Sequence, residues 1–188
     1  MTVVLGSASP RRRDLLQQLG VTFTVVSPDV DETPRAGESP VHYVQRLALD
    51  KSMAITSMDD TLVITADTTV DLGGEILGKP ADDAEAGAML RRLSARTHRV
   101  HTGVVVRLGD RALADAVTSL VTFVALTPAT IEWYVGTGEP LDKAGAYAVQ
   151  GAGAILVRRV SGSVSNVIGL PLHTVARLAR ELGVPLHP

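Results

Sequence analysis

Three consecutive arginines, Arg11, Arg12 and Arg13, follow a short apolar strand and a turn of small residues near the start of the chain. Ser9 and Pro10 predict that a helix begins here, with Ser9 as its N-cap. The helix dipole already places partial positive charge at this end, so three cations in the first turn disfavour the helix itself. Free N–H groups and surplus arginine would instead suit a phosphate-bearing ligand. The alternative is a solvated basic cap on an ordinary helix.

Carboxylates that could take part in chemistry occur at two places in the sequence. Asp67 follows the β-rich run Leu62–Ala66, and ligands of open α/β sheets bind beyond the carboxyl ends of strands. Asp67 could therefore bind a metal or act as a base. The polar loop 27–38 also carries acidic residues, namely Asp29, Asp31 and Glu32. Carboxylate oxygens suit magnesium, so the loop could hold a divalent cation. The alternatives are an Asx turn at Asp67 and an ordinary solvated loop.

Two lysines are placed where they could meet an anion. Lys51 lies on the apolar face of a helix predicted from Ser39 to about Ser57. It either extends outward to solvent, which is the commoner arrangement, or contacts an anion. The segment 73–79 has the spacing of a phosphate loop, but Pro80 stands where that motif needs Ser or Thr, so we reject it. Lys79 can still contact phosphate as a point charge.

Two histidines, His98 and His101, are separated by an odd number of positions in a segment predicted to be a strand. Successive side chains of a strand point to opposite faces of its sheet, so these two rings should face opposite sides. We therefore do not expect a chelating pair, and interpret both histidines as structural or exposed.

The elements that must position these residues alternate between strand and helix early in the chain. Strands are predicted at 3–5, 21–26, 62–66, 99–108 and 116–126, a hairpin at 69–77, and helices after Pro10, Pro40 and Pro128 and at 82–93 and 171–182. Residues 162–166 are predicted to form a polar turn. This pattern predicts an α/β fold with a mixed, twisted sheet and flanking helices. No repeat or linker divides the chain, so residues 1–188 are predicted to form a single domain.

Composition narrows the class of protein. The chain has 188 residues, of which 45% are hydrophobic, and it contains no cysteine, which excludes disulfides and thiolate chemistry. A net charge of −2 and an aromatic content of 3% disfavour a nucleic-acid-binding protein. No apolar run approaches the roughly 20 residues that cross a bilayer, and no signal peptide is recognisable. We therefore expect a cytoplasmic protein with no membrane or nucleic-acid partner.

Several separated motifs together resemble one family, the Maf nucleotide pyrophosphatases, first described as septum-formation inhibitors. The motifs are SASPRR at 7–12, YVQRLALDK at 43–51, ADTTV at 66–70, GKP at 78–80, EPLDKAGAYAVQG at 139–151 and GLPL at 169–172. Their joint order and spacing are highly specific, and the resemblance covers nearly the whole chain. It implies an inosine-triphosphatase-like α/β fold with a cleft between two lobes, usually as a homodimer.

The resemblance also implies roles for individual residues. Asp67 matches the family's catalytic carboxylate, which is described as the proton acceptor. The positions that match specificity residues are Arg11, Thr68 and Gln150. Further positions that match the family's site are Ser7, Glu32, Lys51 and Lys79. Of these, Ser7, Lys51 and Lys79 are expected to bind the phosphates, and Glu32 is expected to join Asp67 in holding a divalent metal cation, Mg²⁺ or Mn²⁺.

The DKAGAY version of the late motif is similar to the branch of the family that acts on dTTP and UTP. We therefore expect hydrolysis of these nucleotides, and of modified pyrimidine nucleotides, to the monophosphate and pyrophosphate. The chain departs from the family pattern at Val164, Ala95 and Ala148. These departures affect the expected loop packing and substrate preference, and not the expected reaction. The alternative function is a nucleotide-binding regulator of septum formation and cell division that has no catalytic activity.

Overall fold

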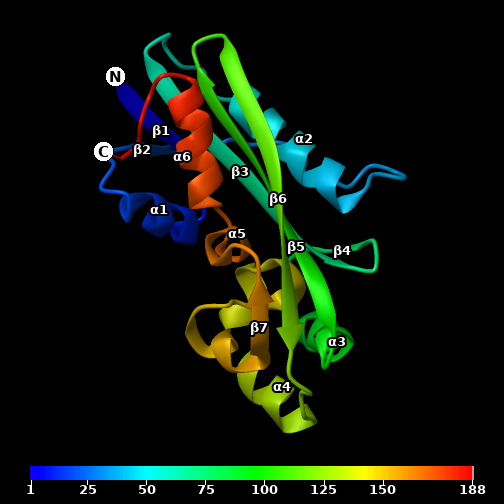
Figure 1. Ribbon diagram of the computed structural model, residues 1–188. Helices are drawn as coiled ribbons and strands as arrows, with labels where there is room; N and C mark the ends of the chain where they lie inside the picture. Colours follow the sequence, from blue (N-terminus) through cyan, green and yellow to red (C-terminus); the bar gives the residue numbers. More distant parts are fainter. Residues whose placement is uncertain (188) are drawn as a thin grey trace.

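The computed structural model of the protein describes residues 1–187, which form one seven-stranded sheet with flanking helices (Figure 1). The strand order is β2-β1-β3-β5-β6-β7, and β4 pairs with β3. The strands are β1 (Thr2–Gly6), β2 (Thr24–Val26), β3 (Thr61–Leu72), β4 (Glu75–Leu77), β5 (Thr97–Leu108), β6 (Arg111–Phe123) and β7 (Val157–Ser161). Strand β1 runs parallel to β2 and β3, and the other pairs are antiparallel. The predicted mixed α/β sheet is confirmed.

Helices cover both faces of this sheet. They are α1 (Pro10–Gln17), α2 (Pro40–Met53), α3 (Asp83–Leu93), α4 (Pro128–Val135), α5 (Val164–Ile168) and α6 (Leu172–Glu181), with 3₁₀ segments η1 (Glu139–Asp142), η2 (Ala144–Ala146) and η3 (Gly151–Leu156). Helices α1 and α6 pack on one face, where Leu16 and Leu178 join Leu62 in a buried cluster. The segment after α2 covers the other face, where Ile55 packs on Val63.

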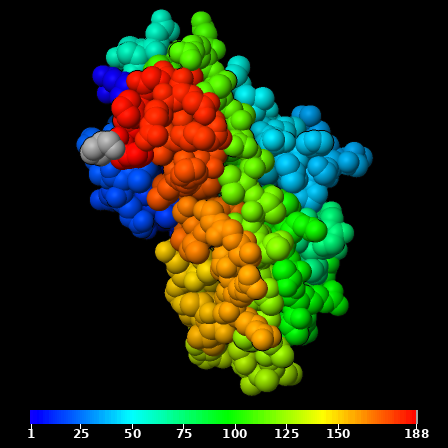
Figure 2. Space-filling model, in the orientation of Figure 1, coloured from blue at the N-terminus to red at the C-terminus, as the bar shows by residue number. Residues whose placement is uncertain are grey.

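Strands β3, β5 and β6 are long and connect the two ends of the molecule (Figure 1). They contribute to two large hydrophobic clusters, one toward each end of these strands. One cluster contains Leu62, Ile64 and Ala66 of β3. The other contains Val70 of the same strand, together with Phe123 and buried residues of α3, α4 and η3. Figure 2 shows the N-terminal segment and α6 packed together at one end, and residues 128–160 at the other. Residues 67–69 lie between the clusters, as a cleft between two lobes requires.

Asp67 lies in the middle of a strand, not at its carboxyl end as the run 62–66 predicted. The parallel pairing of β1 with β3 stops where Gly6 meets Thr65. Strand β3 continues to Leu72, because β5 and the predicted hairpin partner β4 pair with its second half. Asp67 therefore lies just beyond the carboxyl end of β1, the strand beside β3. The rule that ligands bind beyond the carboxyl ends of strands thus applies to β1 and not to β3.

A glycine brings α2 close to Asp67. Gly103 of β5 is the register partner of Asp67. A Cβ atom at Gly103 would lie 2.2 Å from the carbonyl oxygen of Val44 in α2, so only glycine fits at this crossing. The close approach of α2 to β5 sets Lys51, two turns further along the helix, beside β3.

N-cap residues determine where helices α2 and α3 begin. The hydroxyl of Ser39 accepts a hydrogen bond from the His42 N–H at 3.3 Å, and the Asp82 carboxylate accepts one from Glu85 at 2.8 Å. Ser9 occupies the N-cap of α1 as predicted, but within the described chain its side chain makes no capping hydrogen bond. The donors at the start of α1 are therefore left without this partner.

Several predicted boundaries were wrong. Strand β2 begins at 24 and not at 21, α2 ends at 53, and β6 runs from 111 to 123, because a tight turn at Gly109 (φ 55°) joins β5 and β6 as a hairpin. The predicted polar turn at 162–166 is largely helix α5. There Ser163 caps the helix by accepting the Asn166 N–H, and the buried Asn166 amide donates to the Val100 carbonyl at 3.1 Å. A buried anchor of this kind leaves no periodic signal.

Candidate active site

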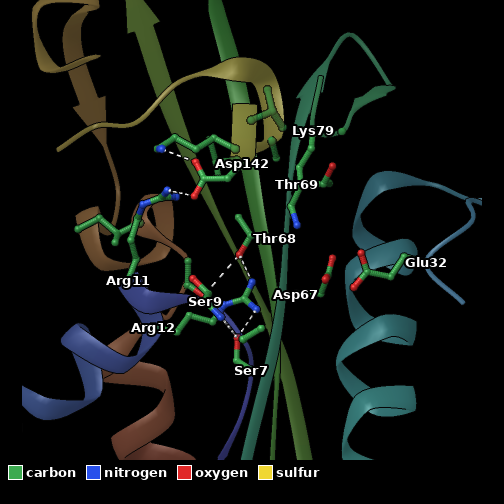
Figure 3. A pocket seen from close by; sticks show the side chains of 18 of the residues that line it. Ser7, Ser9, Arg11, Arg12, Glu32, Asp67, Thr68, Thr69, Lys79 and Asp142 are labelled. Atoms are coloured by element: carbon green, nitrogen blue, oxygen red, sulfur yellow. Dashed lines mark hydrogen bonds and ion pairs between the residues drawn. The ribbon is translucent and has the colours of Figure 1, made fainter. Parts of the chain in front are cut away.

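A cavity of about 540 Å³ opens between the two hydrophobic clusters (Figure 3). It is bounded by the β1–α1 turn, α2, the middle of β3, the β4–α3 turn, the η1–η2 segment and the end of α5. Its polar lining includes Ser7, Ser9, Arg11, Arg12, Glu32, Lys51, Asp67, Thr68, Lys79 and Asp142. Its apolar lining includes Val70, Val100, Tyr147, Val149 and Val167. A space of this size suits a small-molecule ligand with one charged and one apolar part.

Lys51 points into this cavity and joins two carboxylates. Its Nζ atom lies 2.7 Å from Oδ1 of Asp67 and 2.6 Å from Oε1 of Glu32. Lys51 is only 8% exposed and Asp67 only 7%. Lys51 therefore does not extend to solvent, although that is the commoner arrangement for a lysine on an apolar helix face. The sequence showed the correct helix face, but the acceptors on β3 and on the loop before α2 determine the direction of the side chain.

Asp67 and Glu32 differ in their electrostatic surroundings. Burial raises the pKa of Asp67 above its usual range, although Lys51 and Arg12 oppose the shift. Burial also disfavours the charged form of Glu32, but there the hydrogen bond and charge of Lys51 outweigh it, and the pKa is lowered. The cavity therefore contains one carboxylate with enhanced basicity beside one that stays ionised.

Arg12 crosses the base of the cavity and was not assigned a role from the sequence. Its guanidinium donates hydrogen bonds to the Gly169 carbonyl at 2.8 Å, the Thr68 hydroxyl at 3.1 Å and the Ser7 hydroxyl at 3.2 Å (Figure 3). Burial lowers its pKa, and the nearby carboxylate of Asp67 opposes this. A signal was present, because Arg12 precedes the buried Leu15 and Leu16 by three and four residues and so shares their helix face.

Thr68 and Gly169 complete the polar base of the cavity. The Thr68 hydroxyl lies 2.9 Å from that of Thr102 on β5. Gly169 has φ 126°, a conformation that side chains rarely adopt, and a Cβ atom there would lie 3.4 Å from the Thr68 hydroxyl oxygen. The glycine carbonyl can thus approach Arg12, which connects α1, β3 and the end of α5.

Arg11 faces the opposite side of the cavity mouth. Its Nη2 atom lies 2.9 Å from Oδ2 of Asp142 in η1 (Figure 3). Asp142 is also held by Lys143, whose Nζ atom lies 2.5 Å from Oδ1. The Arg11–Asp142 pair therefore bridges the two lobes across the cavity.

The β1–α1 turn presents backbone donors to the same space. The Ser7 hydroxyl accepts from the Ser9 N–H at 3.2 Å and from Arg12. Inside α1 the first backbone bond runs from the Arg13 N–H to the Ser9 carbonyl, so the N–H groups of Arg11 and Arg12 have no helical partner. Together with the arginine side chains, this helix start can bind an anion.

The family model described as Maf-like protein matches residues 2–182. This chain belongs to the Maf family. It is 54% identical to a dTTP/UTP pyrophosphatase of Myxococcus xanthus over 98% of this chain and 94% of that protein. It is 53% identical to the dTTP/UTP pyrophosphatase of Anaeromyxobacter dehalogenans, covering 98% of this chain and 95% of that protein. With the dTTP/UTP pyrophosphatase of Shewanella oneidensis it shares 46% identity over 98% of this chain and all of that protein.

Among solved structures, the Ham1 protein of Staphylococcus aureus matches 65% of this Maf chain and 72% of its own, with 17% identity and a TM-score of 0.48. A Ham1 protein of Coxiella burnetii matches with a TM-score of 0.44 and the same identity. The mixed α/β fold is evident from the sheet and helices of the Maf chain itself.

Most residues singled out from the sequence meet in this cavity of the Maf protein. Its lining includes Ser7, Arg11, Glu32, Lys51, Asp67, Thr68 and Lys79. Lys79 is exposed, and its ammonium forms no ion pair with residues 1–187. Gln150 does not line the cavity; it is exposed at the N-cap of η3, directly after the lining residue Val149. Its proposed contact with a substrate therefore requires the substrate or the loop to extend past Val149.

The residues that could hold a metal are Asp67 and Glu32. Within residues 1–187, no group of three or more His, Asp or Glu side chains is arranged to hold a metal ion. The two carboxylates nevertheless share one cation, because both contact Nζ of Lys51. Magnesium is commonly bound by one or two carboxylates together with waters and substrate phosphates. This donor set therefore fits an ion that binds together with a phosphate ligand.

The predicted arrangement of the two histidines is confirmed. His98 lies beside the hydrophobic cluster that contains Phe123, and its Nε2 atom is 2.8 Å from the Tyr147 hydroxyl. The Nε2 atom of His101 lies 3.1 Å from Oδ2 of Asp71. Both are buried, and each ring is hydrogen-bonded to a different side chain of the protein. Among residues 1–187, no helix combines the length and apolar character needed to cross a bilayer.

Proposed function

We propose that this Maf protein hydrolyses dTTP and UTP, and modified pyrimidine nucleotides, to the nucleoside monophosphate and pyrophosphate. The observation that carries the proposal is the Lys51–Asp67 ion pair of 2.7 Å inside a cavity lined by further cations. The names of relatives that are 46–54% identical over almost the whole chain support the substrate assignment. In this proposal residues 1–188 act as one catalytic domain.

The triphosphate would be held by cations that come from distant parts of the sequence. Arg11 and Arg12 come from α1, Lys51 from α2 and Lys79 from the β4–α3 turn. Ser7 adds a neutral donor, as do the N–H groups of Arg11 and Arg12, which have no partner inside α1. Such an arrangement neutralises the roughly four negative charges of a nucleoside triphosphate and fixes the orientation of its phosphate chain.

Asp67 acts as the general base in this account. A water molecule attacks the α-phosphorus while its proton passes to the Asp67 carboxylate. The new phosphorus–oxygen bond forms, the bond to the bridging α–β oxygen breaks, and pyrophosphate leaves with the bonding electrons. An ordinary aspartate with a pKa near 3.9 is a weak base, and in the protein without a metal ion burial raises the pKa of Asp67.

Asp67 and Glu32 would hold a divalent cation, Mg²⁺ or Mn²⁺, when the nucleotide binds. The ion would polarise the phosphate oxygens and activate water. Lys51 would then exchange part of its contact with the two carboxylates for contact with the phosphates. The arrangement without ligand, with both acids on one ammonium, avoids an unpaired buried charge.

The nucleoside would lie against the apolar lining formed by Tyr147, Val149 and neighbouring valines. Arg11, Thr68 and Gln150 are the proposed specificity residues. The Gln150 amide offers both a donor and an acceptor, as the edge of a pyrimidine requires. We further propose that the protein is cytoplasmic and forms a homodimer, and light scattering of the purified protein would test the dimer.

The direct test is to incubate the purified protein with dTTP, UTP, CTP, ATP and GTP, with Mg²⁺ or Mn²⁺, and measure pyrophosphate. We expect stoichiometric monophosphate and pyrophosphate from dTTP and UTP, and slower release from the purine nucleotides. Release of inorganic phosphate and a diphosphate would place cleavage at another bond and contradict the proposal. Tight binding of dTTP without turnover would favour the non-catalytic regulator of cell division.

A further inference from the structure

The segment that carries Glu32 has no regular structure of its own. Residues 27–38 form neither helix nor strand, and the Glu32 side chain is half exposed. A carboxylate on such a segment loses conformational freedom when it is fixed beside Lys51, and this disfavours an ordered metal site. Some other contact must therefore hold the segment if Glu32 is to act together with Asp67.

Arg46 of α2 provides one such contact. Its guanidinium forms two hydrogen bonds with the Glu38 carboxylate, of 2.6 Å and 2.8 Å, and donates a third to the Thr33 carbonyl at 3.2 Å. The Glu38 carboxylate also accepts the Arg35 N–H at 3.1 Å. The side chains of Arg46 and Glu38 are only 13% and 9% exposed, so this pair is shielded from water far more than an ordinary surface ion pair.

Tyr43, one turn earlier in α2, provides the second contact. Its hydroxyl donates a hydrogen bond of 2.9 Å to the backbone carbonyl of Glu32 itself. The three groups that face the segment, Tyr43, Arg46 and Lys51, therefore all come from one rigid helix. Asp50, also on α2, lies 3.5 Å from Arg46 and helps to orient it.

We propose that Arg46 and Tyr43 are positioning residues, which hold residues 32–38 against α2 so that the Glu32 carboxylate remains available to the divalent cation beside Asp67. Neither residue needs to touch that ion. Arg46 acts through Thr33 and Glu38, and Tyr43 acts through the Glu32 carbonyl. This inference rests on the proposed role of Glu32 in metal binding.

The test measures Mn²⁺ binding directly, by electron paramagnetic resonance, to protein saturated with the non-hydrolysable α,β-imido analogue of dTTP. A blank with the nucleotide alone is subtracted. We expect Glu32→Gln and Arg46→Met each to weaken Mn²⁺ binding by about 10-fold, the scale on which groups that orient metal ligands act. Tyr43→Phe, which removes one hydrogen bond, should cause a smaller loss. Arg177→Met is the matched control, because it removes an arginine of α6 that also has two carboxylate partners, Asp115 of β6 and Glu181 of α6, and it should leave binding unchanged.

The double variant Glu32→Gln/Arg46→Met separates positioning from a general effect on the fold. If Arg46 acts through Glu32, the double variant should bind Mn²⁺ no more weakly than Glu32→Gln alone. Losses that multiply would overturn the proposal. In turnover assays, the Arg46 variant should need about 10-fold more Mg²⁺ for half-maximal rate, while kcat at saturating Mg²⁺ stays close to that of the wild type.

Arg46→Lys keeps the test decisive if Arg46→Met does not fold. It retains the charge near Glu38 but loses the two-pronged geometry and the bond to Thr33, so its Mn²⁺ affinity should lie between those of the wild type and Glu32→Gln. Unchanged affinity in both Arg46→Lys and Tyr43→Phe would refute the positioning role alone. Unchanged affinity in Glu32→Gln would refute the metal role of Glu32 itself, and the inference with it.

Discussion

The ammonium of Lys51 lies 2.7 Å from the carboxylate of Asp67, and both side chains are almost excluded from solvent. Burial raises the pKa of Asp67, and the charge of Lys51 is the largest effect that opposes the rise. The pair therefore holds a carboxylate that is more basic than an exposed aspartate, and the neighbouring charge of Lys51 favours its ionised form. We regard this relationship as the chemical centre of the cavity.

Replacing Lys51 with Met should make activity more sensitive to acid. A general base works only when deprotonated, and loss of the neighbouring cation raises the pKa of Asp67 further. The acid limb of the pH profile of kcat/KM should therefore move to higher pH by about 1 unit or more. The loss of a phosphate contact should lower the rate at every pH. An unmoved acid limb, with Arg177→Met as the reference variant, would mean that Lys51 does not control the ionisation of Asp67.

Arg12 and its neighbour Arg13 should behave very differently when each is changed to Lys. Arg12→Lys breaks the guanidinium network to Ser7, Thr68 and Gly169, so we expect a free energy of unfolding lower by about 2 kcal/mol and a clear loss of kcat/KM. Arg13 is exposed and lies 3.7 Å from Asp14, so Arg13→Lys should change neither quantity. Urea denaturation and steady-state kinetics measure both. Equal effects of the two substitutions would contradict the structure.

Asp142 should compete with the substrate for Arg11. Its carboxylate is 64% exposed and lies 2.9 Å from the Arg11 guanidinium, where a phosphate oxygen of the substrate would bind. An exposed pair is worth at most about 1 kcal/mol, so Asp142→Asn should lower the KM for dTTP by about 2- to 5-fold. Glu75→Gln, which breaks the exposed pair with Arg92, is the control and should leave KM unchanged. A raised KM in Asp142→Asn would show that Asp142 orients Arg11 and does not compete for it.

His98 should make the fold sensitive to acid. Burial lowers its pKa from 6.5 to about 4, so the folded protein binds fewer protons than the unfolded chain between these values. The stabilisation is complete above pH 6.5 and is lost as pH falls toward 4, with a cost of about 2 kcal/mol at pH 5. Urea denaturation at pH 7.5 and pH 5 should show this difference in the wild type and a smaller one in His98→Gln. The exposed His42, changed to Gln, should retain the full difference.

Sequence patterns predicted most elements because their signals are local. Ser39-Pro40 and Asp82 start helices through contacts within three residues, and the hairpin at Gly73-Gly74 needs only its own turn. Boundaries that depend on pairing with other strands were harder to predict from the sequence. The length of β3, and hence the place of Asp67 within it, depends on pairing with β4 and β5.

The site could be predicted as a set of residue types more readily than as a geometry. Helical periodicity placed Lys51 on the correct face, but its acceptors lie 16 or more residues away in sequence. The Arg11–Asp142 pair joins residues 131 positions apart, which no local pattern reveals. The three arginines together indicated an anion site, but only the spacing of Arg12 from Leu15 and Leu16 indicates that this one points inward.

The most direct test of the central claim is the turnover of Asp67→Asn, measured as pyrophosphate released from dTTP with Mg²⁺. The account predicts a rate reduced by at least about 100-fold, in a variant that unfolds like the wild type and still binds the α,β-imido analogue of dTTP. Asp142→Asn, an equal change at the cavity mouth, should retain turnover. Near-normal pyrophosphate release by Asp67→Asn would contradict the assignment of Asp67 as the base, and with it the proposed mechanism.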